Sequence, residues 1–412
     1  MNILYISFGV PFPPDKGEKI RAFHQIRYLS REHTIHLACL ITDLNDVKHL
    51  KNMEEYCASV DAAYRNPRLA TLLSGLSVIA GKPFSVGSFY SRDLKKKIVQ
   101  RLRSTKLDCI LVCTSSMAQY VCHVSAIPKL IDFADVVSEL WKLSAGYHSF
   151  PFSWVYSLEA RRLARYEEAI ARTFDHSIFV SKEEARIFQP RARGCFVSVV
   201  PNGVDFDYFS QIAHLAPCSN YPILLFMGTM DYFPNVDAVR YFCREILPLI
   251  QEQLPSTHFE IVGRRPTRNV RRLAKNRHVT VTGRVTDVRP YLARAAIMVA
   301  PFRIARGIQN KVLEAMASGL PVVGTSVAFQ GLDEVRSAGV HVADDPREFA
   351  LKVIALLKDP DSRRRCALRA AKYVKRHHDL QDQGARLSHL LLEVTGRNTE
   401  RNNAVRREHP ES

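Results

Sequence analysis

Short apolar runs rich in β-branched residues alternate with segments of helical periodicity along most of the chain. The first run, "MNILYISF" at 1–8, predicts a buried strand, and apolar residues at Phe23, Ile26 and Leu29 predict the helix that follows it. The run "HTIHLACL" at 33–40 then returns to strand. A strand, a helix and a strand in this order predict a βαβ unit with parallel strands.

This alternation continues to about residue 325 and restarts once, at "PILLFMG" (222–228). We therefore predict an α/β protein with two Rossmann-like, doubly wound domains instead of one very large sheet. Ligands of such sheets bind beyond the carboxyl ends of the strands, so two facing domains would enclose a central cleft. Further strands are expected at 108–114, 128–135, 176–181, 194–203, 258–263, 279–283, 296–301 and 322–325.

The domains are expected at 1–205 and 218–375, with their boundary in the aperiodic stretch "FSQIAHLAPCSNYP" (209–222). A helix near 376–396 is expected to pack back on the first domain. The polar, aperiodic segment 397–412 is expected to be disordered.

Composition limits the cellular setting. No run approaches the roughly 18 apolar residues of a membrane span, and the N-terminus lacks the charged region of a secretory signal. The nine cysteines are scattered and form no C-x-x-C pair, which is typical of reduced thiols. We therefore expect a cytoplasmic protein without a disulfide framework.

The chain is strongly basic, with a formal net charge of +17 and a pI near 9.6. Such a surplus attracts nucleic acid, anionic lipid headgroups or diphosphate ligands. The basic residues are not interleaved with aromatic ones as base-stacking platforms require, so no nucleic-acid partner is expected.

The segment "SRDLKKKIVQRLRSTK" (91–106) is an amphipathic basic helix, with Leu94, Ile98 and Leu102 at four-residue spacing. It follows the apolar segment 69–81. Together they have the features of a peripheral attachment to the anionic inner face of the plasma membrane. The alternative is a solvated outer helix of the sheet.

The stretch "RGIQNKVLEAMASGLPVV" (306–323) carries the clearest candidate chemistry. Gly319 suits the position after a helix C-terminus, and the buried strand "VVGT" follows. Gly307 lets backbone approach a ligand, and the first helical turn favours an anion. Lys311 and Glu314 share one helix face, as a nucleotide diphosphate and its ribose would require. An ordinary αβ unit with a solvated Lys–Glu pair is the alternative.

The motifs "VVPNGVD" (199–205) and "GIQNKVLEAMASGLPVV" (307–323) on two consecutive α/β domains resemble those of family-4 retaining glycosyltransferases of GT-B fold. The stretches at 11–29, 132–141 and 226–239 are similar to the sugar transferases of PEP-CTERM/exosortase exopolysaccharide systems. The resemblance implies transfer of a hexose, with retention, from a nucleotide-sugar donor to a lipid-linked or growing exopolysaccharide acceptor. The first domain would bind the acceptor and the second the donor.

By this resemblance, Glu314 binds the ribose hydroxyls, since a carboxylate can accept from both hydroxyls of a cis-diol. Gly283, Arg284 and Val285 would lie at the nucleobase. Gly17 would approach the diphosphate or the transferred sugar. The remaining candidate donor-binding residues are Gly228, Arg264, Arg306, Gly307 and Lys311.

The sequence departs from the family at the leaving group. Arg306 stands where a second glutamate is common, while Thr229 and Pro234 replace an expected arginine and lysine. A departing diphosphate needs fixed cations, and Arg306, Lys311 and Arg264 could supply them. The alternative is that Arg306 recognises an acidic donor sugar.

On the acceptor side, Ala134 replaces a common histidine. Asp132 and Asp135 are then the candidate catalytic residues, which could orient the acceptor hydroxyl or take its proton. Helix N-capping is an equally good interpretation of Asp135.

The D-x-D pattern of Asp205 and Asp207 falls in an interdomain loop, and no metal or other cofactor is expected to be required. Two rival functions stay open. A sugar-nucleotide epimerase of similar fold would need no acceptor, and a basic nucleic-acid-binding protein would bind no sugar nucleotide.

Overall fold

The computed structural model describes residues 1–14, 17–147, 149–212, 221–334 and 337–408. The chain forms two compact units: unit 1 comprises Met1–Pro201 and Gln381–Ser412, and unit 2 comprises Asn202–Leu380. Most of the stretch expected to hold the boundary, 213–220, lies outside the described residues. Both units are α/β folds with a parallel sheet, as predicted.

Unit 1 has a seven-stranded parallel sheet of order β3-β2-β1-β4-β5-β6-β7. Its strands are β1 (Asn2–Ser7), β2 (Thr34–Ile41), β3 (Ser59–Tyr64), β4 (Cys109–Cys113), β5 (Lys129–Ala134), β6 (His176–Phe179) and β7 (Val197–Val199). The sequence did not predict β3, because Ser59 and Asp61 interrupt its apolar pattern, and its residues are mostly half-buried at the sheet edge.

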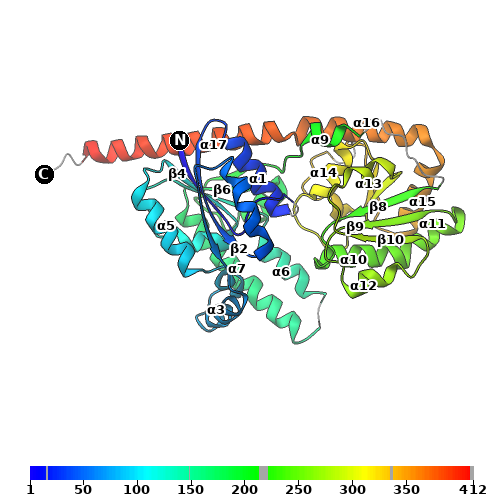
Figure 1. Ribbon diagram of the computed structural model, residues 1–412, viewed down its shortest axis with the longest axis horizontal. Coiled ribbons are helices and arrows are strands. Elements are labelled where there is room, and N and C mark those ends of the chain that lie inside the picture. Colours follow the sequence, from blue (N-terminus) through cyan, green and yellow to red (C-terminus); the bar gives the residue numbers. More distant parts are fainter. Residues whose placement is uncertain (15–16, 148, 213–220, 335–336, 409–412) are drawn as a thin grey trace. The chain divides into compact units, whose positions relative to one another are not determined.

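Helices cover both faces of this sheet (Figure 1). Ile3 and Tyr5 of β1 pack in the core that includes α1 and α17, whereas Leu4 and Ile6 pack in the core on the opposite face, with α5, α7 and α8. The helices are α1 (Gly17–Leu29), α2 (Leu50–Glu54), α3 (Pro67–Ile79), α4 (Phe84–Ser88), α5 (Arg92–Ser104), α6 (Val137–Ala145), α7 (Phe152–Thr173), α8 (Lys182–Phe188) and α17 (Leu380–Glu408), with 3-10 turns at Leu44–His49 and Ser115–Tyr120.

Unit 2 has a six-stranded parallel sheet of order β10-β9-β8-β11-β12-β13. Its strands are β8 (Ile223–Met227), β9 (His258–Val262), β10 (Val279–Gly283), β11 (Ile297–Ala300), β12 (Val322–Gly324) and β13 (His341–Val342). Its helices are α9 (Phe206–Ser210), α10 (Phe233–Tyr241), α11 (Leu247–Gln253), α12 (Arg268–Leu273), α13 (Arg289–Arg294), α14 (Asn310–Ala317), α15 (Pro346–Lys358) and α16 (Pro360–His377), with a 3-10 turn at Ser326–Phe329. A π-helical turn at Phe242–Ile246 joins α10 to α11.

In both sheets the strand order reverses beside the first strand, between β1 and β4 in unit 1 and between β8 and β11 in unit 2. Loops diverge at such a switch point, and the crevice between them is the usual ligand site of a doubly wound sheet. The topology therefore predicts one candidate site at the carboxyl edge of each sheet.

Helix α17 lies along unit 1 (Figure 1) and contributes Leu387, Leu390, Leu391 and Val394 to its core. It reaches Glu408, so the predicted disorder is wrong for 397–408, and 409–412 lie outside the described residues. The helix continues because no proline occurs at 380–409, and because Glu393 pairs with Arg397 one turn later.

The docking of α17 depends on Gly384. An added Cβ would lie 2.2 Å from Cγ of the Tyr28 ring, whereas nothing lies within 4 Å of a Cβ at Gly396 on the same helix. We expect Gly384→Ala to lower the free energy of unfolding of unit 1 by about 1–3 kcal/mol through overpacking. Gly396→Ala should raise it by up to about 1 kcal/mol through helix propensity.

Both tryptophans of the chain lie in unit 1, so their fluorescence in a urea titration reports its unfolding. Equal shifts of the two midpoints in the same direction would contradict the close approach of Gly384 to Tyr28.

Candidate active site

Helix α14 has the boundaries that the sequence indicates. It begins at Asn310, shortly after Gly307, whose φ is 61°. Its end is marked by Gly319, with φ 73°, and the Leu320 N–H donates to the Ala315 carbonyl at 3.0 Å. This geometry places Lys311 in the first turn of the helix, directly beyond β11.

Lys311 is held by three groups at the switch point of unit 2. Its Nζ donates to Oδ1 of Asn235 at 2.6 Å and lies 5.2 Å and 4.9 Å from the ring centroids of Phe226 and Phe302. Burial lowers the pKa of Lys311 to about 7, although Glu314 opposes the shift. Burial therefore opposes the ammonium form, while Asn235 and the two rings fix the position of the amine.

Glu314 lies one turn further along α14 and is half-buried. Burial raises the pKa of its carboxyl to about 7, and Lys311 acts in the opposite direction. Among the described residues, no hydrogen bond to this carboxylate occurs. Its lone pairs are therefore available to a ligand, as the contact with a diol requires.

Three glycines close the ends of β8, β9 and β10. A Cβ on Gly228 would lie 2.7 Å from Nδ2 of Asn235 and 3.1 Å from Nζ of Lys311, and a Cβ on Gly263 would lie 1.6 Å from the Gly228 carbonyl oxygen. The Gly263 N–H donates to the Gly283 carbonyl at 3.2 Å. Only glycine fits at Gly228 and Gly263, whereas Gly283 has open space around it and a φ of 75°.

The other candidate donor-binding residues follow neighbouring strands of this edge. Arg264 is half-buried after β9, and its carbonyl accepts from the Met230 N–H at 2.8 Å. Arg306 is half-buried between β11 and α14. Beyond β10, Arg284 is exposed and Val285 is half-buried. The fold thus brings the candidates of unit 2 to one edge of its sheet.

The "PNGVD" motif supports α14 from the side. Nδ2 of Asn202 donates to Oδ1 of Asn310 at 2.8 Å, and the Val204 N–H donates to the His378 carbonyl at 2.8 Å. A Cβ on Gly203 would lie 2.8 Å from Cα of Leu380. Sequence reasoning did not identify Asn202, Asn235 or Asn310 as supporting residues, because their partners are 76 to 108 residues away.

In unit 1, Asp132 lies at the end of β5 with no exposed surface. Its Oδ2 accepts from Nε of Arg21 and Nε2 of Gln25, both at 2.7 Å, and its Oδ1 accepts from Nη2 of Arg21 at 3.1 Å and from the Ala134 N–H at 3.0 Å. These four bonds use its lone pairs. The hypothesis that Asp132 contacts the acceptor is therefore wrong: it ties α1 to the strand end.

Asp135 follows on the same loop and is half-buried. Helix α6 begins at Val137 with Val136 as N-cap residue, so the N-cap interpretation of Asp135 is wrong as well. Ala134 has φ 59° and Thr114, at the end of the adjacent β4, has φ 76°. Non-glycine residues in this region cost about 1–3 kcal/mol each and cluster at functional sites.

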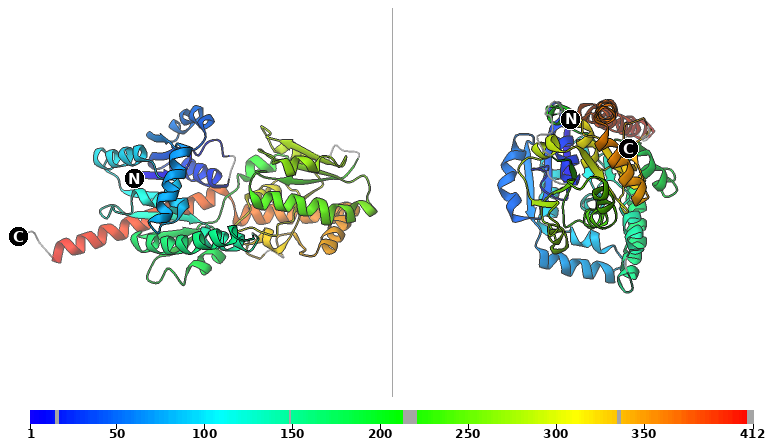
Figure 2. Two further views of the ribbon diagram at one scale, coloured as in Figure 1. Left: turned by 90° about the horizontal axis from the view of Figure 1, so that it is seen from below. Right: turned by 90° about the vertical axis from the view of Figure 1, so that its right-hand side faces the viewer.

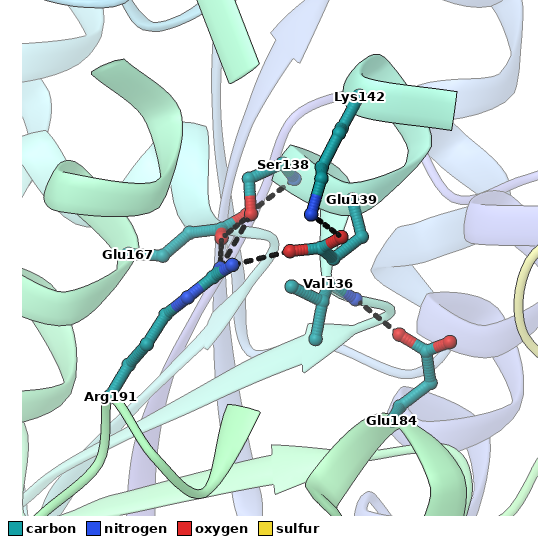
Figure 3. Close-up of polar contacts among 7 residues, drawn as sticks. All are labelled: Val136, Ser138, Glu139, Lys142, Glu167, Glu184 and Arg191. Atoms are coloured by element: carbon teal, nitrogen blue, oxygen red, sulfur yellow. Dashed lines mark hydrogen bonds and ion pairs between the residues drawn. The ribbon is translucent and has the colours of Figure 1, made fainter. Parts of the chain in front are cut away.

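Glutamates from two other helices hold the first residues of α6 (Figure 3). Oε2 of Glu184 accepts from the Val136 N–H at 2.7 Å, and Glu167 accepts from the N–H and Oγ of Ser138 at 3.1 Å and 2.6 Å. Burial raises the pKa of Glu167 to about 7, against the effect of its bonds to Ser138 and the charge of Arg191.

Arg191 completes this cluster, donating to Oγ of Ser138 at 2.8 Å and pairing with Glu139 (Figure 3). The group fixes the loop that carries Asp135. Gly17 is the exposed first residue of α1, in the segment that follows β1. The strand order therefore places Gly17 and Asp135 at the carboxyl edge of the same sheet.

Asp205, the first carboxylate of the D-x-D pattern, is the N-cap of α9 and accepts from the Tyr208 N–H at 3.1 Å. Within the described ranges, no three His, Cys, Asp or Glu side chains gather where they could hold a metal ion. Nor does any helix of these ranges combine the length and hydropathy needed to cross a bilayer.

Comparison with known proteins agrees with this geometry. Residues 221–359 match the family model "Glycosyl transferases group 1", so unit 2 carries a glycosyltransferase group 1 domain. A Klebsiella pneumoniae protein described as "Uncharacterized 44.6 kDa protein in cps region" is 20% identical over 395 residues, 92% of this chain and 96% of that protein. The phosphatidyl-myo-inositol mannosyltransferase of Mycobacterium tuberculosis is 30% identical over 182 residues, 42% of this chain and 46% of that protein.

Solved structures share the fold of the whole chain. Sucrose-phosphate synthase from Thermosynechococcus elongatus gives a TM-score of 0.73 at 16% identity, covering 96% of this chain and 99% of that one. Anabaena Alr3699/HepE in complex with UDP-glucose gives 0.69 at 15% identity, covering 95% and 100%. The two units therefore have the GT-B fold.

Lys311 and Glu314 of α14 predict an unusual dependence of stability on pH. Glu314 has a pKa of about 7 when folded against 4.5 ordinarily, so its contribution is full below pH 4.5 and is lost as the pH rises through 7. Lys311 has a pKa of about 7 against 10.5, so its contribution is full above pH 10.5 and is lost as the pH falls through 7. Their summed contribution should be lowest near pH 7.

Melting temperatures measured from pH 4.5 to 10.5 test this minimum. Glu314→Gln should make the falling limb below pH 7 shallower, leaving the part that Glu167 contributes, and Lys311→Met should remove the rising limb above pH 7. Glu348→Gln, on the exposed part of α15, is the control and should leave the profile unchanged. A Glu314→Gln profile parallel to that of the wild type would refute the assignment.

Proposed function

We propose that the protein transfers a sugar from a nucleoside diphosphate sugar to an acceptor hydroxyl. The observation that carries this proposal is the unbonded, half-buried carboxylate of Glu314 in a group 1 glycosyltransferase domain, beside the switch point of its sheet. An anion at the mouth of α14 and a diol at Glu314 would be recognised by one rigid element. UDP-glucose bound to the similar fold of Alr3699/HepE supports a donor of this class.

The chemistry requires positive charge where the nucleoside diphosphate departs. Arg264, Arg306 and Lys311 all stand at the carboxyl edge of unit 2, and the dipole of α14 adds to their field. Burial lowers the pKa of Lys311 to about 7. A bound diphosphate would favour the ammonium form, so donor binding would place the full charge where it is needed.

On the acceptor side, we propose that Asp135 orients the acceptor hydroxyl, on a loop fixed by Glu167, Glu184 and Arg191. Gly17 would approach the transferred sugar from the segment after β1. Gly283, Arg284 and Val285 would contact the nucleobase. No metal takes part in this proposal, because cationic side chains supply the charge.

The more specific part of the proposal rests on the sequence motifs at 199–205 and 307–323. We propose a family-4 hexosyltransferase that retains anomeric configuration and acts in exopolysaccharide synthesis of the PEP-CTERM/exosortase type. The cps-region relative and the mannosyltransferase of a phosphatidyl lipid support a lipid-linked or growing glycan acceptor. Such an acceptor places the protein at the cytoplasmic face of an anionic membrane, to which its net charge of +17 would attract it.

Glu314→Ala tests the donor site. Charged hydrogen bonds of this kind are worth about 1.5–3 kcal/mol each, so we expect donor affinity to fall at least tenfold and transfer to be nearly abolished. Thermal shift with UDP-, GDP- and ADP-sugars identifies the donor, because a ligand at a hundred times its Kd stabilises by about 2.7 kcal/mol. Titration of that donor then compares Glu314→Ala with Glu348→Ala, its surface control.

Unchanged donor affinity in Glu314→Ala would overturn the site. Consumption of the donor without any acceptor would instead favour an epimerase or a hydrolase, and salt-dependent affinity for nucleic acid alone would favour the non-enzymatic alternative.

Arg306→Glu tests the source of the leaving-group charge. If Arg306 serves the leaving group, the variant should lose transfer to every donor and bind the bare nucleoside diphosphate more weakly. If Arg306 recognises an acidic sugar, diphosphate affinity should hold while preference shifts to neutral sugars. Diphosphate affinity and sugar preference equal to those of the wild type would show that Arg306 takes no part in the mechanism. Isothermal titration and a donor panel supply both measurements.

A further inference from the structure

Exposed apolar side chains concentrate in two segments of unit 1. Twenty-two large hydrophobic side chains are exposed among the residues that the structure describes, and half of them lie on α3 or around the facing ends of α6 and α7. The five on α3 are Leu69, Leu72, Leu76, Val78 and Ile79, and the six around α6 and α7 are Leu143, Tyr147, Phe150, Phe152, Trp154 and Val155. A patch of this kind on a soluble domain marks an interaction surface.

Helix α3 is ordered although it buries little of its own apolar surface. Leu69, Leu72, Leu76 and Ile79 stand at i, i+3, i+7 and i+10, so they form one face, and each is at least 50% exposed. The helix is started by Asn66, whose Oδ1 accepts from the backbone N–H groups of the two residues after Pro67. Its apolar face therefore remains open in a well-formed helix.

The two segments belong to one platform. Glu159 of α7 accepts from the backbone N–H groups of Phe84 and Ser85 at 2.9 Å and 3.1 Å, which fixes the start of α4. The Trp141 ring of α6 lies 5.2 Å from that of Phe84 and 4.8 Å from that of Tyr156. Helix α4 thus links α3 to α6 and α7, and Figures 1 and 2 show these elements projecting from the same end of unit 1.

Most exposed charges on the segments of this platform are positive, although Lys142 pairs with Glu139 at 3.5 Å. No Asp or Glu occurs at 62–92 or at 140–158, whereas Arg68, Lys82 and Lys142 are exposed there. An apolar surface with exposed cations such as Arg68 and Lys82 at its edge complements an anionic lipid surface.

Helix α5 cannot itself supply the apolar contact, because Leu94 and Ile98 are fully buried against the sheet. For its apolar face, the interpretation as an outer helix of the sheet is correct. The cations of its other face remain in solvent: Lys95, Lys96 and Arg103 line a shallow depression of about 710 Å³. Electrostatic attraction to a membrane would therefore come from α5, and the apolar contact with it from α3.

We propose that α3 and the facing ends of α6 and α7 insert into the interfacial layer of an anionic bilayer, to which the cations of α5 attract the protein. The thirteen residues of α3 span about 20 Å at 1.5 Å each, too short to cross a hydrocarbon core of about 30 Å, so the helix lies in the interface. The proposal deepens the membrane part of the proposed function. Its tests contain no sugar nucleotide, so they do not depend on the donor site.

Vesicle flotation separates the two contributions. Wild-type protein should bind phosphatidylglycerol–phosphatidylcholine vesicles at 0.1 M salt and retain a bound fraction at 1 M, because screening weakens only the ionic part. Leu72→Ser/Leu76→Ser/Ile79→Ser should lose the salt-resistant fraction, at least about tenfold. Lys95→Gln/Lys96→Gln/Arg103→Gln should lose the salt-sensitive part. Lys97 is left in place because its Nζ donates to the Ala62 carbonyl at 2.6 Å.

The control is Leu351→Ser/Leu368→Ser, which changes two exposed leucines of unit 2 and should bind vesicles as the wild type does. Binding of the α3 variant equal to that of the wild type would overturn the proposal. So would a wild-type dimer that dissociates in the α3 variant while vesicle binding is unchanged, because the surface would then belong to a second copy of the chain.

Trp154 provides a measurement that leaves α3 untouched. It is 61% exposed, and Trp141 is the other tryptophan of the chain, so Trp141→Phe isolates its signal and keeps the aromatic contacts. Adding anionic vesicles should move the Trp154 emission to shorter wavelength, and lipids with brominated acyl chains should quench it. An unchanged spectrum in the presence of bound vesicles would exclude insertion of α6 and α7.

Discussion

In each unit a charged side chain with fixed partners lies at the edge where the candidate binding loops begin. In unit 1 the charge is Asp132, and its four hydrogen bonds join α1, β5 and the loop after it. In unit 2 it is Lys311, held between Asn235 and two phenylalanine rings. Burying an ion is unfavourable unless its partners are fixed, so these two charges determine which residues can stand around them. Gly228 illustrates the constraint, because a Cβ there would meet Lys311 and Asn235.

The two charges differ in what they leave for chemistry. The lone pairs of Asp132 all accept hydrogen bonds from the protein, so Asp132 fixes the loop that carries Ala134 and Asp135. Lys311 shares its helix with Glu314, whose carboxylate has no hydrogen bond from the described residues. One unit thus uses its buried charge to shape a loop, and the other uses it beside a carboxylate that can bind a ligand.

The sequence predicted those features that depend on neighbouring residues. Periodicity located the strands from β1 to β12 apart from β3, and Gly319 marked the end of α14. Prediction failed where the partner is remote. Asp61 interrupts the apolar pattern of β3, and its ion-pair partner, Arg101, lies on α5. Asp132 was predicted to contact the sugar acceptor because its partners, Arg21 and Gln25, lie more than a hundred residues before it. Composition also misled at 397–408, where a polar segment extends an existing helix.

The division of the chain has a consequence for how the molecule is made. Unit 2 is one continuous segment, so it can fold as soon as residue 380 has left the ribosome. Unit 1 comes first in the sequence, yet its core includes Leu387, Leu390, Leu391 and Val394 of α17. The nascent first unit must therefore wait, with that part of its core open to solvent and to chaperones, until synthesis has passed through the whole of the second.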